Sequence, residues 1–272
     1  MTEFLHFFED VPDWQKLLWI VICLCLSWSL EGFFPLIKFG YDKWKHAGIN
    51  FIFLGTSIAV NLLFGLLTLG VFEWTSRYEI GLLYLFDLPV WLELLIAVMI
   101  VDLIGQYWIH YLLHKYKWMW KFHMIHHSDT KVDATTGTRH HPGDYVLREL
   151  FTLTAIVLTG ASLAYYIIYR IATVLFTYIT HANMALPPWF DKTISLIFIS
   201  PNMHKFHHHF ERPWTNTNYG NIFSLWDRLF GTFVYDDPHK VRYGLDVLDD
   251  ATDEDVGYQF RIPFDKSIRT DY

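Results

Sequence analysis

Cysteine is almost absent from this sequence: Cys23 and Cys25 are the only two, and both lie in an apolar run. With so few thiolates, the chain cannot hold an iron–sulfur cluster or a cysteine-bound zinc. Charged residues are also scarce, at 18% of the total, and acidic residues outnumber basic ones to give a net charge of −7. Because nucleic-acid binding needs a basic face, we expect no nucleic-acid partner. The sequence also lacks a Gly-x-Gly-x-x-Gly dinucleotide fingerprint.

Hydrophobic residues, by contrast, make up 53% of the 272 positions, and aromatic residues 19%. Aromatic side chains in such numbers are typical of the interfaces of membrane proteins. Three apolar segments, at about 17–36, 49–72 and 90–113, reach the length of about 20 residues that crosses a bilayer. The N-terminus is acidic and lacks the basic region of a cleaved signal peptide, so we expect none.

Lysine placement orients these segments. Before the first segment the only basic residue is Lys16, whereas Lys38, Lys43 and Lys45 follow it, and Lys115, Lys117, Lys121 and Lys131 follow the third. Loops rich in lysine and arginine face the cytoplasm. The pattern predicts a multi-pass integral membrane protein with its N-terminus outside and its histidine-rich parts on the cytoplasmic side.

A further apolar region, 150–179, has Arg170 as its only charge. A single crossing would carry His181 away from the other histidines. If His181 belongs with them, the region is a hairpin that turns at 160–162, with arms of about 24 Å at 1.5 Å per residue. We therefore predict an all-α membrane bundle with three parts: membrane helices over 1–101, a histidine-rich catalytic region over 102–235, and an acidic cytoplasmic tail over 236–272.

The histidines fall into boxes at helical spacing. These are HYLLH (His110, His114), HMIHH (His123, His126, His127) and HKFHH (His204, His207, His208), with His181 between the last two. Residues at i, i+3 and i+4 share a helix face, and neutral imidazole is the commonest metal ligand. Eight or nine histidines are too many for one metal but suit two. A zinc protease would need His-Glu-x-x-His, which is absent, so two imidazole-bound metals point to iron and oxygen chemistry.

Asp102 and Gln106 lie at four-residue intervals before His110 and His114. The spacing predicts one polar stripe along the third membrane helix that leads to the metal ligands. Carboxylates at membrane depth are costly, and they are candidates for functional roles by default.

These motifs together resemble those of the fatty acid hydroxylase and sterol desaturase superfamily of integral-membrane di-iron enzymes. The matching residues are Asp102, Tyr107-Trp108, His110, His114, Trp120, Phe122-His123, His126-His127-Ser128, Arg139, His141-Pro142, His181-Ala182-Asn183, His204, His207-His208, Asn218-Tyr219-Gly220 and Trp226 to Thr232. The resemblance covers roughly 102–233. The sequence departs from the family pattern at Tyr111, where arginine is usual, at Asp144, where glutamate is frequent, and at Thr177, where some members have histidine.

The resemblance implies two irons, O₂ as co-substrate, and oxidation of an unactivated C–H bond of a lipid. The implied metal ligands are His110, His114, His123, His126, His127, His204, His207 and His208, with His181 added; ligation by His140 or His141 stays open. Supporting roles around the metals are expected for Asp102, Gln106, Asp133, Arg139, His141, Asp144, Asn183, Asn218 and Asp227. Ligating histidines donate their second N–H to a carboxylate or carbonyl, and the candidate carboxylates are Asp102, Asp133, Asp144 and Asp227. His6, His46 and His239 are expected at the surface or interface.

The predicted function is hydroxylation of a sterol, fatty acyl, ether lipid or carotenoid chain. A desaturase with the same di-iron chemistry is the alternative, and a histidine-rich metal transporter is the alternative of another class. Electrons are expected from a separate ferredoxin, cytochrome b5-like protein or reductase. Zinc is able to replace iron in such a ligand set.

Overall fold

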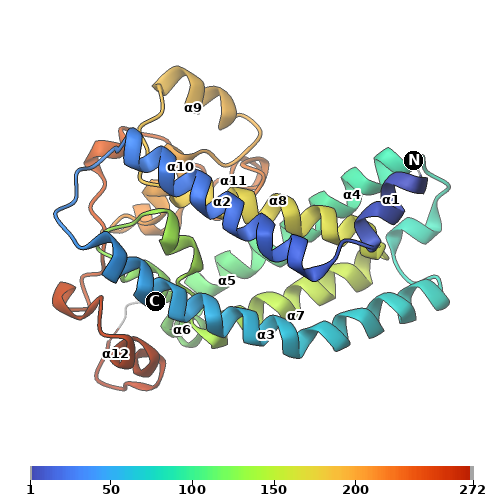
Figure 1. Ribbon diagram of the computed structural model, residues 1–272, viewed down its shortest axis with the longest axis horizontal. Helices are drawn as coiled ribbons and strands as arrows, with labels where there is room; N and C mark the ends of the chain where they lie inside the picture. The colour runs from blue at the N-terminus through green and yellow to red at the C-terminus, as the bar shows by residue number, and fades with distance from the viewer. Residues whose placement is uncertain (1, 270–272) are drawn as a thin grey trace.

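The computed structural model describes residues 2–269, and within this range every regular element is a helix. The α-helices are α1 Thr2–Glu9, α2 Asp13–Phe33, α3 Lys43–Arg77, α4 Val90–Asp102, α5 Ile109–Lys115, α6 Lys117–His127, α7 Pro142–Thr159, α8 Leu163–His181, α9 Pro188–Ile194, α10 Pro201–His207, α11 Leu225–Phe230 and α12 Val256–Arg261. The long helices run side by side, and α6 and α9 to α12 form a cap at one end (Figure 1). The predicted all-α class is confirmed.

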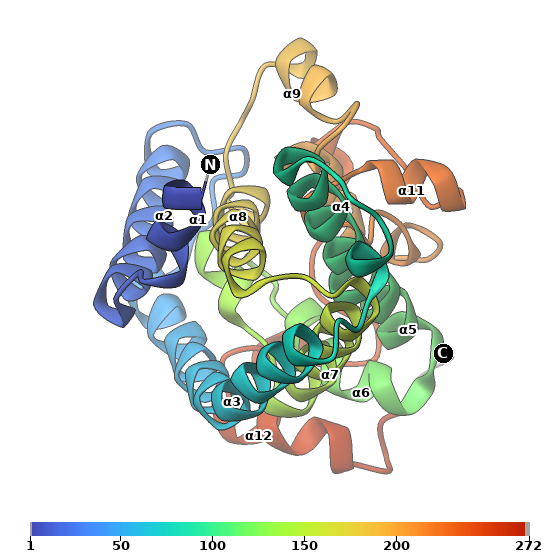
Figure 2. The same cartoon turned by 90° about the vertical axis from the view of Figure 1, so that its right-hand side faces the viewer.

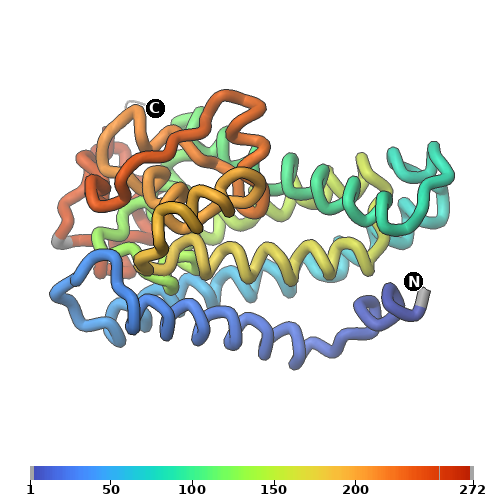
Figure 3. Tube along the Cα trace, turned by 90° about the horizontal axis from the view of Figure 1, so that it is seen from above, coloured from blue at the N-terminus to red at the C-terminus, as the bar shows by residue number. Residues whose placement is uncertain are grey.

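Four helical segments are long and apolar enough to cross a membrane: Asp13–Phe33, Lys43–Leu85, Val90–Lys115 and Leu163–His181. On α3, Leu62, Leu63 and Leu66 are 75–83% exposed. Leucines so exposed on one helix need a lipid environment, because a soluble protein avoids large apolar patches. The view along the bundle shows α2, α3, α4, α7 and α8 arranged around a common centre (Figure 2). Seen from above, α1 lies at the end of the bundle opposite the cap (Figure 3).

The fourth apolar region is a hairpin, as predicted, with α7 and α8 as its arms. The turn uses Gly160 in the left-handed conformation (φ 68°), where an added Cβ would lie 2.6 Å from the carbonyl oxygen of Ile80. Glycine is the residue that such a position favours. Ser162 then caps α8 by accepting a hydrogen bond from Tyr165 N. Both arms are longer than predicted. Pro142 starts α7 before the apolar run begins, and α8 continues to His181, which makes it a fourth segment long enough to cross a membrane.

The third membrane helix is interrupted by a π-helical segment, Leu103–Trp108, between α4 and α5. Hydrogen bonds of the i→i+5 type change the angular spacing of side chains, so the predicted single polar stripe is split. Asp102 points to the cap, where it accepts hydrogen bonds from Trp226 Nε1 (2.9 Å) and backbone N–H groups. Gln106 instead accepts from Arg148 Nη1 (3.2 Å) on α7.

The segment after residue 236 packs onto the bundle. Leu245, Ile262 and Ile268 share one buried cluster with Phe53 of α3 and Trp120 of α6. This cluster joins the first part of α3 to the histidine helix α6.

Candidate metal centre

Two groups of histidine side chains occupy the junction between the membrane helices and the cap. The first is His110, His114, His123, His127 and His207, and the second is His126, His181, His204 and His208. Within each group the candidate ligand nitrogens all lie within 4.8 Å of one another. The structure therefore brings together all nine predicted ligands, and all nine are buried.

Helix geometry divides the histidines between the two groups. On α6, His123 and His127 are four residues apart and share the face toward the first group, whereas His126 faces the second. At the end of α10, His207 joins the first group and His204 and His208 join the second. On both helices the two histidines that are four residues apart share a group, and the histidine three residues from the first of them and next to the second belongs to the other group. Both adjacent sites thus take histidines from α6 and from the end of α10, while α5 completes the first group and α8 completes the second.

The Nε2 atoms of these rings point at one another. The Nε2 atoms of His110 and His123 are 3.0 Å apart, and those of His126 and His181 are 3.1 Å apart. His204 Nε2 lies 3.1 Å from the same nitrogen of His181. A neutral imidazole has one N–H and one lone pair, so several rings converging on one point suit a shared cation better than a hydrogen-bond network.

The outward-facing Nδ1 atoms fix which nitrogen carries the proton. His110 Nδ1 donates to the Tyr219 carbonyl (2.8 Å), and His207 Nδ1 donates to the Thr217 carbonyl (2.7 Å). A carbonyl oxygen only accepts, so the proton is on Nδ1 and the Nε2 lone pair faces inward. The same arrangement holds for His181, whose Nδ1 lies 2.6 Å from a backbone carbonyl oxygen of its own helix. Such outer hydrogen bonds orient metal ligands.

Burial keeps the cap histidines neutral. It lowers the pKa of His123 to about 4, although the neighbouring Asp144 carboxylate acts in the opposite direction. Burial, followed by the proximity of other imidazoles, holds the pKa values of His127 and His207 well below the ordinary value. Metal binding requires neutral imidazole, so these residues fit a bound metal at neutral pH without first losing a proton.

Three of the predicted supporting residues shape the surroundings of the histidines. Asp144 accepts from His123 Nδ1 (3.0 Å), His140 Nδ1 (2.9 Å) and Arg148 Nε (3.0 Å). Asp227 accepts from the backbone N–H of Tyr219 (2.7 Å) and of the next residue, and so positions the carbonyl that His110 uses. Asn218 holds the same loop from its other side.

Asn218 has a positive φ of 53°, and its amide donates to backbone carbonyls of residues 203 and 234. Burial raises the pKa of Asp227 to about 6, with its hydrogen bonds acting to lower it. Asp227 and Asn218 therefore position the backbone of the loop whose carbonyl accepts from His110, and their hydrogen bonds are not to the rings themselves.

Four other predicted supporting residues form hydrogen bonds with groups other than the nine clustered histidines. Asp133 accepts from Tyr41 Oη (2.7 Å) and caps a short helical turn, and Arg139 donates to the Ile125 carbonyl (3.1 Å). His141 caps α7, and Asn183 pairs with backbone atoms of residue 37. These four side chains stabilise the scaffold, because buried backbone groups need hydrogen-bond partners and the side chains supply them.

His46 corrects the expectation of a surface position. It is fully buried, and its Nε2 lies 2.9 Å from Asp129 Oδ1 while its Nδ1 lies 3.3 Å from Asp133 Oδ2. A histidine between two carboxylates is a buried ionic pair of the scaffold. Burial by itself raises the pKa of Asp129, but its contact with His46 outweighs this and holds that pKa well below its usual range.

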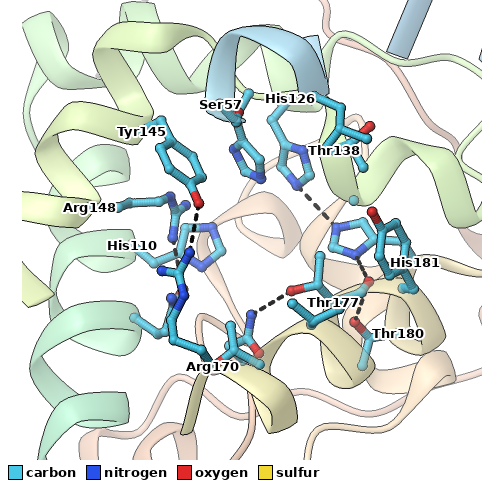
Figure 4. Close-up of a pocket in the computed structure, with 18 of the residues that line it drawn as sticks. Ser57, His110, His126, Thr138, Tyr145, Arg148, Arg170, Thr177, Thr180 and His181 are labelled. Atoms are coloured by element: carbon cyan, nitrogen blue, oxygen red, sulfur yellow. Dashed lines mark hydrogen bonds between the residues drawn. The ribbon is translucent and has the colours of Figure 1, made fainter. Parts of the chain in front are cut away.

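A cavity of about 170 Å³ adjoins both histidine groups. Its wall includes His110 of the first group and His126, His181 and His204 of the second. Tyr145, Arg148 and Arg170 lie across the cavity from His126 and His181 (Figure 4). A molecule bound here would lie beside both candidate metal positions.

Comparison with known proteins agrees with this geometry. The family model described as fatty acid hydroxylase matches residues 94–232, which include all nine histidines of the two groups. Ornithine lipid hydroxylase OlsE of Rhizobium tropici is 29% identical over 53% of this chain and 43% of its own length. Alkylglycerol monooxygenases of Homo sapiens and Xenopus tropicalis are 28% and 26% identical over 87% of this chain and 51% of theirs. The chain spans about half the length of these relatives, and no solved structure matches it significantly.

Proposed function

The chain belongs to the fatty acid hydroxylase family, and from this premise we propose that it hydroxylates an aliphatic C–H bond of a membrane lipid with two irons bound by its nine clustered histidines. The observation that carries the proposal is the division of these histidines into two adjacent groups of inward-facing Nε2 atoms. The family is one of iron-dependent lipid oxidoreductases. When bound, the metal pair would supply the activation of O₂ that attack on an unactivated C–H bond needs.

The residues of the chain have three tasks in this reaction. Backbone carbonyls and Asp144 orient four of the imidazoles, those of His110, His207, His181 and His123, by accepting from their Nδ1–H groups. The apolar helices deliver a lipid to the cavity from within the bilayer, and the buried wall keeps bulk water away from the reacting carbon. Hydroxylation places one oxygen atom in the lipid and converts the other to water, so an electron pair must come from a separate donor protein.

Hydroxylation is favoured over desaturation because the relatives in the comparison are a hydroxylase and monooxygenases. A metal transporter would need metal-binding groups along a path across the membrane. In the part of the chain that the structure describes, the groups able to hold a metal all lie where the helices meet the cap. The lysines that flank this end, such as Lys115 and Lys131, support a cytoplasmic position for it.

The test compares the wild type with His126→Ala, which removes one ligand of the second group, and with His239→Ala, an exposed matched control. Lipids of cells that express each variant are profiled by mass spectrometry. We expect a lipid with one added oxygen atom in cells with the wild type and the control, and its loss with His126→Ala. If no lipid differs by one oxygen atom between wild type and His126→Ala, the proposed function is wrong.

A further inference from the structure

We infer that the cavity beside the histidines binds the uncharged, hydroxyl-bearing end of the lipid substrate, and that the Arg170–Glu149 pair recognises it. This inference rests on the proposed function and specifies its substrate class. It starts from a feature that the metal centre does not use: a hydrogen-bonded network of ionic and polar side chains within the membrane part of the bundle.

The network joins three helices. Arg170 of α8 donates to Glu149 Oε1 of α7 (2.9 Å), to Asn61 Oδ1 of α3 (3.2 Å) and to Tyr145 Oη (3.1 Å). Asn61 Nδ2 also donates to Tyr145 Oη (2.8 Å). All four residues line the cavity. Ionisable groups at membrane depth are costly and face functional cavities.

Arg170 precedes His181 by eleven residues on α8, which is about 16 Å along the helix axis. The network therefore marks the end of the cavity away from the cap, while the histidines mark the other end. A ligand that fills the cavity touches both.

Among the polar groups of the wall, those of Ser57 and Asn221 each include an atom without a hydrogen-bond partner in the part of the chain that the structure describes. Ser57 Oγ has no hydrogen-bond partner there, and Ser57 is only 6% exposed. Asn221 donates from Nδ2 to Thr177 Oγ1 (3.1 Å), which leaves its buried Oδ1 without a donor. Buried polar atoms normally have partners, so these two point to a ligand that both donates and accepts hydrogen bonds.

The charges of the wall are already balanced. Arg170 pairs with Glu149, and Arg148 pairs with Asp144 at 3.0 Å. A ligand with a net charge would bring an unpaired ion into a membrane-buried cavity, at a cost of several kcal/mol. An uncharged group with hydroxyls meets the free hydrogen-bonding capacity without that cost.

The size of the cavity limits what enters it. At about 170 Å³ it is close to the roughly 150 Å³ cavity that accepts benzene, which corresponds to about six non-hydrogen atoms. The fused-ring nucleus of a sterol is too large. Since the wall has the ion pair at one end and the histidines at the other, the oxidised carbon lies near the hydroxylated end of the lipid.

The hydrocarbon chain needs a separate way out. The apolar part of the wall is Ile20 of α2, Leu54 and Ile58 of α3, and Val174 of α8. All four are only partly buried, and α2 and α3 expose leucine and isoleucine outward. We assign this side as the opening through which the chain extends into the bilayer.

The test uses the full, iron-loaded protein and three probes: 1-O-hexadecylglycerol with an uncharged diol, an acylated ornithine lipid with charges, and hexadecane with no polar group. The variants are Glu149→Gln and the milder Asn61→Ala. The matched control is Glu93→Gln, which removes a carboxylate that accepts from Tyr165 Oη (2.7 Å) outside the cavity wall.

We expect the wild type to oxidise the diol lipid near its headgroup and to prefer it to the other probes. Both cavity variants should keep their iron but lose about tenfold or more in kcat/KM, mainly through KM, because a hydrogen bond to a charged group is removed. The control should stay within about twofold of the wild type. Unchanged kcat/KM in both cavity variants, preference for the ornithine lipid, or oxidation in mid-chain would each overturn the inference.

A binding measurement separates this inference from the proposed function. 1-O-Hexadecylglycerol should raise the Tm of the wild type and of Glu93→Gln, but not that of Glu149→Gln or Asn61→Ala. A shift without oxidation supports the subsite and contradicts the oxygenase. Oxidation without a variant-dependent shift overturns the subsite alone, and the absence of both overturns both.

Discussion

Asp144 offers a sharp test of how the protein prepares its metal ligands. Its side chain is fully buried and accepts hydrogen bonds from His123, His140 and Arg148 at 2.9–3.0 Å. In Asp144→Asn the amide keeps the size but places an NH₂ group opposite N–H donors. His123 then relieves the clash by moving its proton to Nε2, the nitrogen that faces His110 at 3.0 Å. A protonated Nε2 cannot bind a metal.

The expected effect is selective. Loss of an outer hydrogen-bond partner costs about 10–100-fold in metal affinity, which is about 1.4–2.7 kcal/mol. Of the two histidine groups, His123 belongs to the five-histidine one, so Asp144→Asn should lose roughly half of the bound iron and the four-histidine group should keep its metal. Iron per chain is measured by elemental analysis during titration with a chelator.

The matched control is Asp133→Asn, because Asp133 is equally buried but accepts from Tyr41 and from the backbone of Thr135. This variant should lower the Tm without lowering the iron content of the folded protein. Equal iron loss in the two variants would refute the reasoning, because the effect would then follow from general destabilisation. Full retention of iron by Asp144→Asn would refute it as well.

Three further predictions concern stability and are each measured by unfolding in detergent. Gly160→Ala should cost about 1–2 kcal/mol because of its positive φ and its close backbone neighbour, whereas Gly65→Ala, in open space on α3, should be neutral or stabilising. His123 has a folded pKa of about 4 against 6.5 when unfolded, so the unfolded chain binds the proton first. As the pH falls from 6.5 to 4, the metal-free protein should lose about 3 kcal/mol through His123, and the other buried histidines with lowered pKa values should add to this loss; a gain would contradict this. His46→Leu should cost about 3–5 kcal/mol by removing the imidazole between two buried carboxylates, while His239→Leu, which is exposed, should cost almost nothing.

Much of the site could be predicted because it depends on side-chain type and helical spacing. His110 and His114 had to share a face of one helix, and the balance of lysines placed them at the same end as the cap histidines. The hairpin followed from the position of His181 and from the small residues at 160–162, and the structure places its turn at Gly160.

Other features could not be predicted from residue type and helical spacing. The π-helical segment Leu103–Trp108 separates Asp102 from Gln106, and a helix of this kind has no clear signature in residue type. The acceptors for His110 and His207 are backbone carbonyls, which every residue has and which only the folded loop selects. Long-range packing likewise buries His46, because its partners lie more than eighty residues away.

The polar network of the cavity was also missed. Arg170 is evident in the sequence as the only charge of its apolar region, but its partners on α3 and α7 are spread over 109 residues. A lone arginine in an apolar helix could have prompted a search for a carboxylate on a neighbouring helix. Glu149 is the residue that such a search would have found.

The metal content of the purified protein tests the central claim most directly. After expression in iron-supplemented medium, elemental analysis should give about two irons per chain, and His123→Ala and His204→Ala should each retain about one, because they belong to different histidine groups. A single metal per wild-type chain, or one zinc in place of iron under these conditions, would contradict the account.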